Sequence, residues 1–176
     1  FRNDFDNRDK SDKKIITSLL FGSENDGSEY ASSLEFTDAR ILFFPVKSAK
    51  GIFAWVTCQF VINRFINDLN IMGIDGITIN MNNVEPSEDT AVILNKSESN
   101  IILNHNKSDK EKYILLEEFG YKISRHENIF SSLIDKMKSI DKENYIMAKL
   151  SKDIVVVNDE AFSYFVNMST EVDTRI

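Results

Sequence analysis

The sequence is poor in residues that cross-link or break a chain: it has one cysteine, two prolines and six glycines in 176 residues. The single cysteine, Cys58, cannot form a disulfide within the chain and excludes zinc sites built from several cysteines. With a hydrophobic fraction of 42%, so few chain breakers also exclude a disordered or fibrous protein. We therefore expect a packed globular protein whose core needs no cross-links.

Long apolar runs are also missing. No run approaches the roughly 20 residues that a membrane-spanning helix needs, and no signal peptide with a basic start and an apolar middle is present. The sequence begins at Phe1 and not at methionine, so the removal of a leader stays open. We expect a cytoplasmic protein that has no membrane partner.

The common catalytic and cofactor-binding motifs are absent. The sequence contains no Gly-Lys-Ser or Gly-Lys-Thr of a phosphate-binding loop and no Gly-x-Ser-x-Gly of a hydrolase. Its two histidines, His105 and His126, do not have the spacing of a metal-binding pair. These absences predict no catalytic residue, no metal and no cofactor.

Acidic residues outnumber basic ones, 28 to 21, which gives a formal net charge of −7. Nucleic-acid affinity depends on clustered lysines and arginines that neutralise phosphates. The net charge therefore predicts that the chain does not bind nucleic acid. An acidic surface favours association with a basic protein instead.

Residues 57–81 contain the clearest periodic pattern. Apolar residues recur at spacings of three and four from Cys58 to Met72, which predicts an amphipathic helix over residues 57–70. Gly73 follows the last periodic residue and predicts the end of the helix, because glycine adopts a left-handed conformation at little cost. The next apolar run, residues 77–79, predicts a buried strand. We interpret the segment as a helix that packs on a sheet.

Shorter patterns predict the other elements. Strands are expected over residues 15–21, 34–46, 52–56, 121–124, 145–150 and 153–157, and a hairpin over residues 91–94 and 100–105. The run over residues 15–21 also fits one helical turn, and one long helix over residues 48–72 is the alternative to the strand at 52–56. Helices are expected over residues 108–119, which start with a capping box, and over residues 127–140 and 161–168. The fold class that follows is α+β: a single domain over residues 1–176 with a mainly antiparallel sheet and three or four packed helices. Residues 1–14 and 169–176 are expected to be loose.

The predicted core consists of large apolar residues from these elements. They are Phe44, Trp55, Phe65, Leu69, Ile77, Ile79, Leu116 and Leu133. Cys58 lies in the apolar stripe of the predicted helix, which predicts a buried and unreactive thiol.

Two predicted loops carry clusters of acidic residues. Residues 22–33 contain Glu24, Asp26 and Glu29, and residues 82–89 contain Glu85, Glu88 and Asp89. Solvated loop charge explains such residues without any function, and a pair of carboxylates could also serve in acid–base catalysis, although the sequence does not say which pair. Because both clusters lie in loops of an acidic chain, we predict that they contact a basic protein partner.

One sequence pattern consists of Phe60, Phe65, Leu69 and residues 73–77 (Gly-Ile-Asp-Gly-Ile). In this pattern and in its acidic, cysteine-poor composition, the chain resembles the immunity proteins of bacterial polymorphic-toxin and contact-dependent inhibition systems. The resemblance implies a protein-binding module that is not an enzyme and that covers the basic active site of a toxin domain with its acidic loops. One alternative is a small transferase or hydrolase. Residues 115–123 are similar to an acetyltransferase segment, but no glycine-rich pyrophosphate loop accompanies them. Another alternative is a secretion chaperone or effector domain.

Overall fold

The computed structural model describes residues 10–22, 32–34, 36–81, 84–93, 99–104, 111–126, 129–140 and 145–170. The chain divides into two compact units, residues 1–40 and residues 41–176. No helix within the described ranges is long and apolar enough to cross a bilayer.

The described part of the first unit contains the helix α1 (Lys10–Phe21). Later residues fold back onto this helix: the Leu34 amide donates to the Leu20 carbonyl at 3.1 Å, and the Ser32 hydroxyl donates to the same carbonyl at 2.9 Å. These bonds satisfy a carbonyl in the last turn that has no partner within the helix. The strand predicted for residues 15–21 is therefore wrong, because that short apolar run is the second half of a longer helix.

Among its described residues, the second unit is built on a seven-stranded sheet with the order β1-β2-β7-β3-β6-β5-β4. The strands are β1 (Phe44–Lys47), β2 (Phe53–Cys58), β3 (Thr90–Ile93), β4 (Leu103–Asn104), β5 (Lys112–Leu116), β6 (Phe119–His126) and β7 (Ile154–Val157). The helices are α2 (Gln59–Ile71), α3 (Ser131–Ile140), α4 (Tyr145–Leu150) and α5 (Asp159–Met168). The β2–β7 and β3–β6 pairs are parallel, and the other four pairs are antiparallel. The predicted α+β fold with a mainly antiparallel sheet is confirmed.

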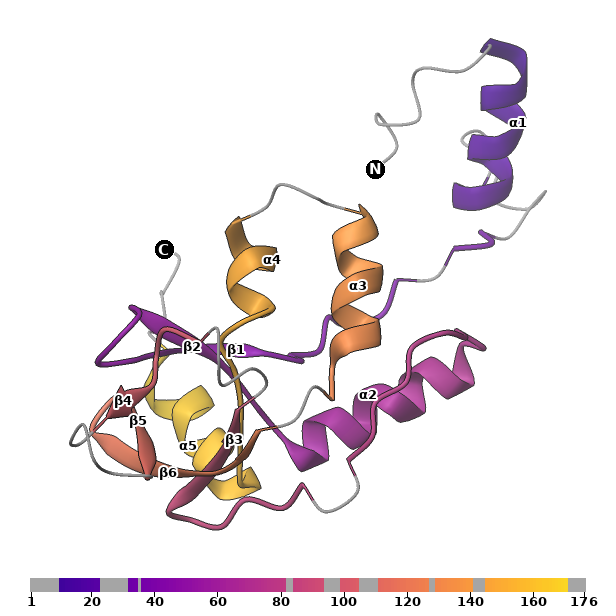
Figure 1. Ribbon diagram of the computed structural model, residues 1–176. Helices are drawn as coiled ribbons and strands as arrows, with labels where there is room; N and C mark the ends of the chain where they lie inside the picture. The colour runs from indigo at the N-terminus through magenta and orange to yellow at the C-terminus, as the bar shows by residue number, and fades with distance from the viewer. Residues whose placement is uncertain are drawn as a thin grey trace, which may run out of the picture. The chain divides into compact units, whose positions relative to one another are not determined.

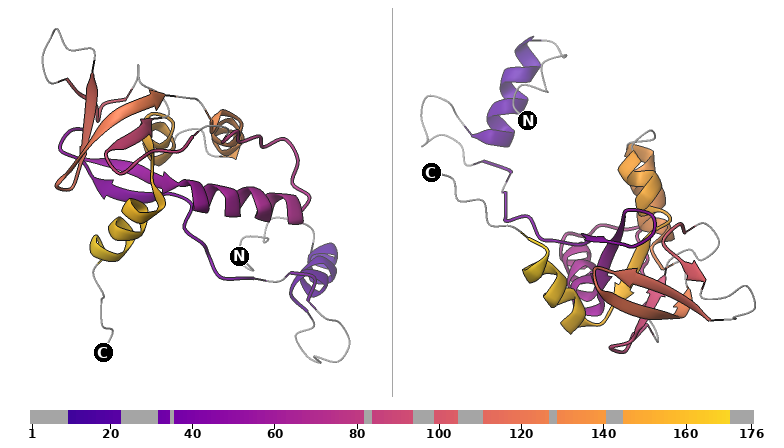
Figure 2. Two further views of the ribbon diagram at one scale, coloured as in Figure 1. Left: turned by 90° about the horizontal axis from the view of Figure 1, so that it is seen from below. Right: turned by 90° about the vertical axis from the view of Figure 1, so that its left-hand side faces the viewer.

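Strand β7 lies between two apolar layers. Val155 and Val157 belong to one layer, together with Phe165 of α5. Ile154 and Val156 belong to the other layer, together with residues of α3 and α4. This alternation follows from the two-residue period of a strand. Figures 1 and 2 show α5 on one side of the sheet and α3 and α4 on the other, which explains why four buried apolar residues follow one another in β7.

Helix α2 continues directly from the end of β2 (Figure 2). Its apolar stripe contributes to both layers, with Val61 in the α5 layer and Ile62 in the other. At its end, Gly73 has φ +63°, and the Ile74 amide donates to the Leu69 carbonyl at 3.0 Å. This is the glycine-terminated helix end that the sequence predicts. The helix predicted over residues 57–70 is confirmed, except that its first two residues complete β2.

The turn after β1 also contacts β5, which is next to the opposite edge strand in the order of the sheet. The Ala49 amide donates to the Leu115 carbonyl at 3.1 Å, and the Glu117 amide donates to the Lys47 carbonyl at 2.9 Å. The turn is therefore held by backbone bonds from an element that follows it by more than sixty residues in the sequence.

The strand predicted for residues 77–79 is wrong. The Thr78 amide donates to the Ser132 hydroxyl at 2.9 Å, and that hydroxyl donates to the Thr78 carbonyl at 2.8 Å. Ile77 and Ile79 pack against the layer that contains α3 and α4, whereas Thr78 is exposed. The segment has the alternation of a strand, but a side chain of α3 takes the place of a neighbouring strand.

The helix predicted for residues 108–119 is also wrong in its described part, because residues from 112 onward form β5 and the start of β6. Ile114 and Leu116 are buried, and Glu117 turns the chain with φ +49°. A short apolar run fits a helix or a strand equally well on periodicity. This segment is a strand because β5 pairs with β4 and β6 in the sheet.

Three other predictions, two of single strands and one of a hairpin, are wrong or only partly right. Residues 145–150 form α4, in which Met147 and Leu150 are buried at a helical spacing of three. Strand β3 pairs with β6 and β7, while β4 pairs with β5, so the predicted hairpin of residues 91–94 and 100–105 does not form. Of the strand predicted over residues 34–46, only the end lies in β1. Of these strands, β3 pairs with strands that lie far away in the sequence, whereas β1 pairs with the nearby β2 and β4 with the nearby β5.

Several local predictions are confirmed. Strands β2, β6 and β7 and helices α3 and α5 correspond to predicted elements, and the Asn158 side chain begins α5 by accepting a bond from the Ala161 amide at 3.0 Å. Of the predicted core, Leu69, Leu116 and Leu133 are buried, and the other residues are half-buried against the two layers. Residues 1–9 and 171–176, which are most of the predicted loose ends, lie outside the described residues.

Candidate functional site

The turn between β1 and β2 presents one candidate surface. We call residues 47–52 the Lys50 turn. Lys47, Lys50 and Ile52 are exposed, Ile52 at 75%. The Lys50 ammonium donates to the Ile102 carbonyl at 2.9 Å, and an ammonium has two further N–H groups that can reach a ligand. The turn therefore offers positive charge to an anion.

The backbone of the Lys50 turn is strained. Gly51 and Ile52 have φ values of +78° and +72°, which are rare for a β-branched residue such as isoleucine. Two bonds close the turn: the Phe53 amide donates to the Gly51 carbonyl at 3.0 Å, and the Ser48 amide donates to the Ile52 carbonyl at 2.9 Å. A Cβ atom on Gly51 would lie 3.0 Å from Cγ2 of Ile101. This position therefore needs glycine for both its conformation and its packing.

A buried ion pair lies behind the turn. Lys149 and Asp153 are 8% and 2% exposed, and Lys149 Nζ lies 2.7 Å from Asp153 Oδ2. The same ammonium donates to the Gly51 carbonyl at 2.8 Å and lies 4.6 Å from the centre of the Phe53 ring. The other carboxylate oxygen, Asp153 Oδ1, accepts from the Ser99 hydroxyl at 2.8 Å. Both charges are removed from water, and both have hydrogen-bond partners.

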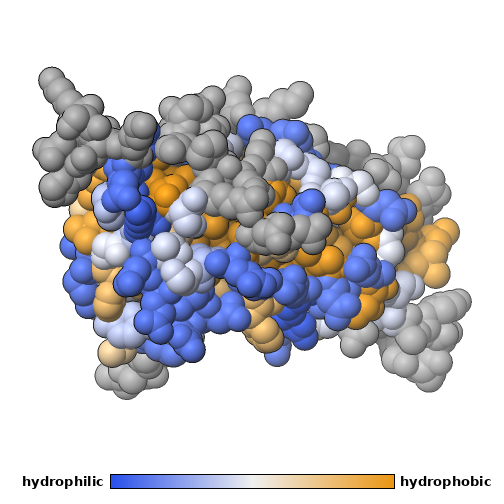
Figure 3. All heavy atoms as spheres, turned by 60° about the horizontal axis from the view of Figure 1, so that its bottom comes forward, coloured by the Kyte–Doolittle hydropathy of each residue, from blue (hydrophilic) through white to orange (hydrophobic). Residues whose placement is uncertain are grey.

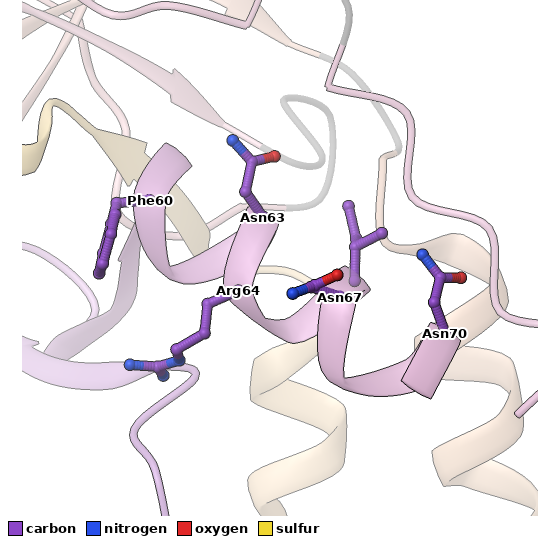
Figure 4. A pocket seen from close by; sticks show the side chains of 6 residues that line it. Phe60, Asn63, Arg64, Asn67 and Asn70 are labelled. Carbon is purple, nitrogen blue, oxygen red and sulfur yellow. The ribbon is translucent and has the colours of Figure 1, made fainter. Parts of the chain in front are cut away.

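The outer side of α2 is the second candidate surface (Figure 4). We call it the α2 face, and its residues line a shallow depression of about 450 Å³: Phe60, Asn63, Arg64, Ile66, Asn67 and Asn70. Figure 4 shows the three amides spaced along the helix, with Phe60 at its N-terminal end. Arg64 Nη2 donates to the Ile41 carbonyl at 2.5 Å. Side-chain amides and aromatic rings bind the edges and faces of unpaired bases.

Apolar residues are exposed at both ends of α2. Phe60, Ile71 and Met72 are each more than half exposed. Figure 3, which brings the bottom of Figure 1 forward, shows hydrophobic residues at the surface between hydrophilic ones. These residues lie at opposite ends of the helix, and single exposed apolar residues do not by themselves indicate a contact surface.

The carboxyl end of the β2–β7 pair carries an acidic surface. A depression of about 310 Å³ is lined there by Gln59, Glu85, Pro86, Val157, Asn158, Asp159 and Glu160. Both α2 and α5 begin at this end, and Asp159 Oδ1 accepts from the Phe60 amide at 3.1 Å. A carboxylate of α5 thus caps α2 and compensates its dipole. Within the described residues, no group of three or more His, Cys, Asp and Glu side chains could hold a metal ion.

Cys58 immediately precedes α2 and is buried. Burial disfavours the thiolate, and with the neighbouring Asp159 carboxylate it raises the pKa of the Cys58 thiol to about 12. The thiol therefore stays protonated near neutral pH, where only a thiolate would be reactive. The prediction of a buried thiol is confirmed.

The structure describes half of the predicted acidic contact residues. One cluster, Glu24, Asp26 and Glu29, lies outside the described residues. In the other cluster, Glu85, Glu88 and Asp89 are exposed, and Glu85 is the one that lines the acidic depression. Their contact with a protein partner stays a prediction.

The Lys50 turn and part of the α2 face belong to one acid-free segment. Residues 39–67 contain Arg40, Lys47, Lys50 and Arg64 and no aspartate or glutamate, although the chain has a net charge of −7. The acid-free segment includes β1, the Lys50 turn, β2 and the first part of α2. The segment therefore has a net positive charge within an acidic chain, because it lacks acidic residues.

Comparisons with known proteins agree on one relative. No protein-family model matches the chain. Over 171 residues, which cover 96% of the chain and 52% of the relative, it is 31% identical to the protein of Pyrococcus furiosus named CRISPR system Cmr endoribonuclease Cmr4. The chain is similar to Cmr4. It spans about half the length of that curated relative.

Solved structures support the same similarity. The structure of oligomeric Cmr4 from Pyrococcus furiosus gives a TM-score of 0.56 with 30% identity, over 77% of this chain and 48% of that chain. The structure of Pyrococcus furiosus Cmr4 (Cas7) gives a TM-score of 0.51 with 31% identity, over 74% of this chain and 48% of that chain. The sequence similarity is therefore accompanied by a similar fold.

These findings correct the functional predictions. The interpretation as an immunity protein with a basic toxin partner is wrong, because the relatives found are Cmr4 proteins. The predictions that the chain is not an enzyme and binds no nucleic acid are contradicted, because the relative is named an endoribonuclease. The alternatives, a small transferase or hydrolase and a secretion chaperone or effector domain, do not match either.

Net charge is a poor predictor of local charge in this chain, because it averages the acid-free segment with the acidic remainder. A count of charges in windows along the chain would have found that segment, since it needs no structure. RNA is also recognised through stacking and hydrogen bonds to unpaired bases, which a cation count does not detect. The burial of Lys149 and Asp153 could not be found in this way, because it depends on residues remote in the sequence.

Proposed function

We propose that this chain is the RNA-contacting part of a CRISPR endoribonuclease subunit similar to Cmr4, and that it acts in the cytoplasm. The observation that carries the proposal is the 31% identity over 171 residues to a protein named a Cmr endoribonuclease. The similar fold of the solved Cmr4 structures supports it. Because the chain spans about half of that relative, RNA cleavage is proposed for the complete subunit and RNA contact for this chain.

We assign RNA contact to the exposed side chains of the acid-free segment within the second unit, residues 41–67. Lys47 and Lys50 are exposed on the Lys50 turn, where their ammonium groups can neutralise phosphates. Phe60, Asn63 and Asn67 on the α2 face offer a ring for stacking and amides for base edges. At the opposite end of the β2–β7 pair, the acidic depression would repel phosphates.

The test is the binding of a short, fluorescein-labelled single-stranded RNA of mixed sequence, measured at several salt concentrations. In the double variant Lys47→Gln/Lys50→Gln, affinity should fall, and the slope of log K against log salt should become shallower by about 0.7 for each phosphate that is no longer neutralised. The matched control is Lys136→Gln/Lys138→Gln, which removes the same charge from the exposed surface of α3. If both double variants lose the same affinity, the assignment of RNA to the Lys50 turn fails.

Protein partners form the second part of the proposal. One similar structure is described as oligomeric Cmr4, and we propose that the complete subunit also assembles with further protein subunits. The exposed Glu85, Glu88 and Asp89 would meet a basic surface of such a subunit, since complementary charge speeds association. Reversing these charges should slow association in a salt-dependent way. An unchanged association rate would remove these residues from the interface.

A further inference from the structure

The Lys50 turn has a conformation that its own residues do not favour. Ile52 is β-branched and exposed, yet it has φ +72°, a region in which its Cβ crowds the backbone. The hydrogen bond from the Phe53 amide to the Gly51 carbonyl closes a three-residue turn around Ile52. Turns of this length with a positive central φ are rare and strained. Such a conformation persists only when surrounding groups fix it.

The buried ammonium of Lys149 supplies one of these fixing contacts. It donates to the Gly51 carbonyl at 2.8 Å, so this oxygen accepts bonds both from the turn and from the ion pair. The ammonium also lies 4.6 Å from the centre of the Phe53 ring. Lys149 therefore contacts the residues on both sides of Ile52, although it lies almost 100 residues further along the chain.

The carboxylate of Asp153 fixes the segment on which the turn rests. Asp153 Oδ1 accepts from the Ser99 hydroxyl at 2.8 Å and from the Asn100 amide at 3.2 Å. Residues 100–102 contact the turn directly. Gly51 lies so close to Ile101 that it has no room for a Cβ atom, and the Lys50 ammonium donates to the Ile102 carbonyl. The ion pair thus connects the turn with its support.

Stability alone does not account for this arrangement. A buried ion pair is often no more stable than well-packed apolar residues of similar volume, because both charges must leave water. An apolar pair could fill the space, but it could not donate a hydrogen bond to the Gly51 carbonyl. The feature that depends on the charges is therefore the geometry of the turn.

We infer that Lys149 and Asp153 are positioning residues, which hold the Lys50 turn in the one conformation that presents Lys47 and Lys50 to RNA. The part of this inference that concerns RNA rests on the proposed function. The part that concerns the turn does not, since it follows from the contacts of Lys149 and Asp153.

The test compares the full chain with the double variant Lys149→Met/Asp153→Asn. Asparagine keeps an oxygen for the Ser99 and Asn100 donors, and methionine keeps the apolar stem of Lys149 but loses its hydrogen bond to the turn. The control is Leu133→Ala, a core variant of α3. The two variants are compared at temperatures equally far below their melting points, so that any loss specific to the turn stands out.

The first measurement is amide hydrogen exchange at Ser48 and Phe53, the two donors that close the turn. Protection should be lost in the double variant and kept in Leu133→Ala. Equal protection of these amides in all proteins would overturn the inference, whether or not the chain binds RNA.

The second measurement is affinity for the labelled single-stranded RNA. The double variant should bind about tenfold more weakly or worse, and the further change Ile52→Asn should restore part of the loss, because asparagine tolerates a positive φ. The variant Ile52→Asn alone is the control, because it shows how this change affects RNA affinity while the ion pair is intact. If the unmodified chain binds no RNA, the proposed function fails, whereas unchanged affinity in the double variant of a binding-competent chain overturns the inference.

Discussion

The two ends of the parallel β2–β7 pair are built from the same strands but carry opposite charge. At the amino end, Lys47 and Lys50 are exposed above a buried ion pair. At the carboxyl end, two helices begin, and Glu85, Asp159 and Glu160 line a depression. Ligands of open α/β sheets usually bind at the carboxyl ends of strands, but the acidic depression at that end would repel phosphates here. If the chain contacts RNA as proposed, local charge therefore places the phosphate contacts at the amino end and leaves only uncharged contacts to α2.

The ends also differ in how a charged group is accommodated. Lys149 and Asp153 are removed from water and depend on each other. Asp159 stays exposed to water while it accepts from the Phe60 amide. Removing a buried partner leaves an uncompensated charge, whereas removing an exposed cap leaves an amide that water can reach. The same kind of substitution should thus have different effects at the two ends.

The largest effect is expected for Asp153→Ala at the amino end. It should lower the free energy of unfolding by about 3–5 kcal/mol, because Lys149 would keep a buried charge and the Ser99 hydroxyl would lose its acceptor. Urea unfolding at neutral pH measures the loss. A decrease below about 1 kcal/mol, the value typical of an exposed pair, would show that the two ends do not differ in this way.

The sequence predicts those features whose causes lie within a few residues. Helix α2 and its end at Gly73, and helix α5 with its cap at Asn158, follow from local spacing and capping, and both are confirmed. Residues 112–119 and 145–150 were assigned to the wrong class, because a short apolar run satisfies both periodicities. Pairing decides between them, as it does for β5, which pairs with β4 and β6.

The candidate site shows the same limit. The charges of the acid-free segment are visible in the sequence, as is the spacing of four between Lys149 and Asp153. Such a spacing normally indicates an exposed pair on a helix surface. Here the pair is buried because the Gly51 carbonyl and residues 99–100 close over it. No local pattern contains that information.

The next effect concerns Cys58 at the carboxyl end and depends on pH. Its pKa is raised from 9.0 to about 12 in the folded protein, first by burial and further by Asp159. As pH rises, the unfolded chain therefore loses the thiol proton before the folded protein does. The contribution of the protonated thiol to the free energy of unfolding is complete below pH 9 and is lost between pH 9 and about 12. The slope is at most about 1.4 kcal/mol per pH unit.

The comparison for this prediction is Cys58→Ala, which has no thiol to titrate. Between about pH 9 and pH 12, the free energy of unfolding of the unmodified protein should fall more steeply than that of the variant. Urea unfolding at a series of pH values gives both slopes. Parallel curves would mean that the thiol is as easily ionised in the folded protein as in the unfolded chain.

A smaller effect is expected for the cap that connects the two helices at the carboxyl end. Asp159→Ala should lower the free energy of unfolding by about 1 kcal/mol, because the Phe60 amide loses its acceptor. Glu160→Ala removes the same charge from the neighbouring exposed position and serves as the matched control. Thermal unfolding of both variants separates the loss of the bond from the loss of charge. Equal losses would assign the effect to charge alone.

The smallest effect on stability is expected for the triple variant Glu85→Gln/Glu88→Gln/Asp89→Asn. These side chains are exposed, and surface substitutions usually change the free energy of unfolding by less than about 0.5 kcal/mol. The variant makes the chain less acidic by three charges without touching the acid-free segment. It therefore separates net charge from local charge as the cause of the proposed RNA affinity.

If local charge decides, affinity for single-stranded RNA at physiological salt should change less in this variant than in Lys47→Gln/Lys50→Gln, because exposed charges are screened over about 8 Å at that ionic strength. If net charge decides, neutralising three acids should raise affinity by at least as much as removing two lysines lowers it. At low salt, where exposed charges act over about 30 Å, the changes in RNA affinity of the two variants should become more similar in size. Persistence of the difference between them at high salt would instead indicate that the Lys50 turn contacts RNA directly, through hydrogen bonds that salt does not screen.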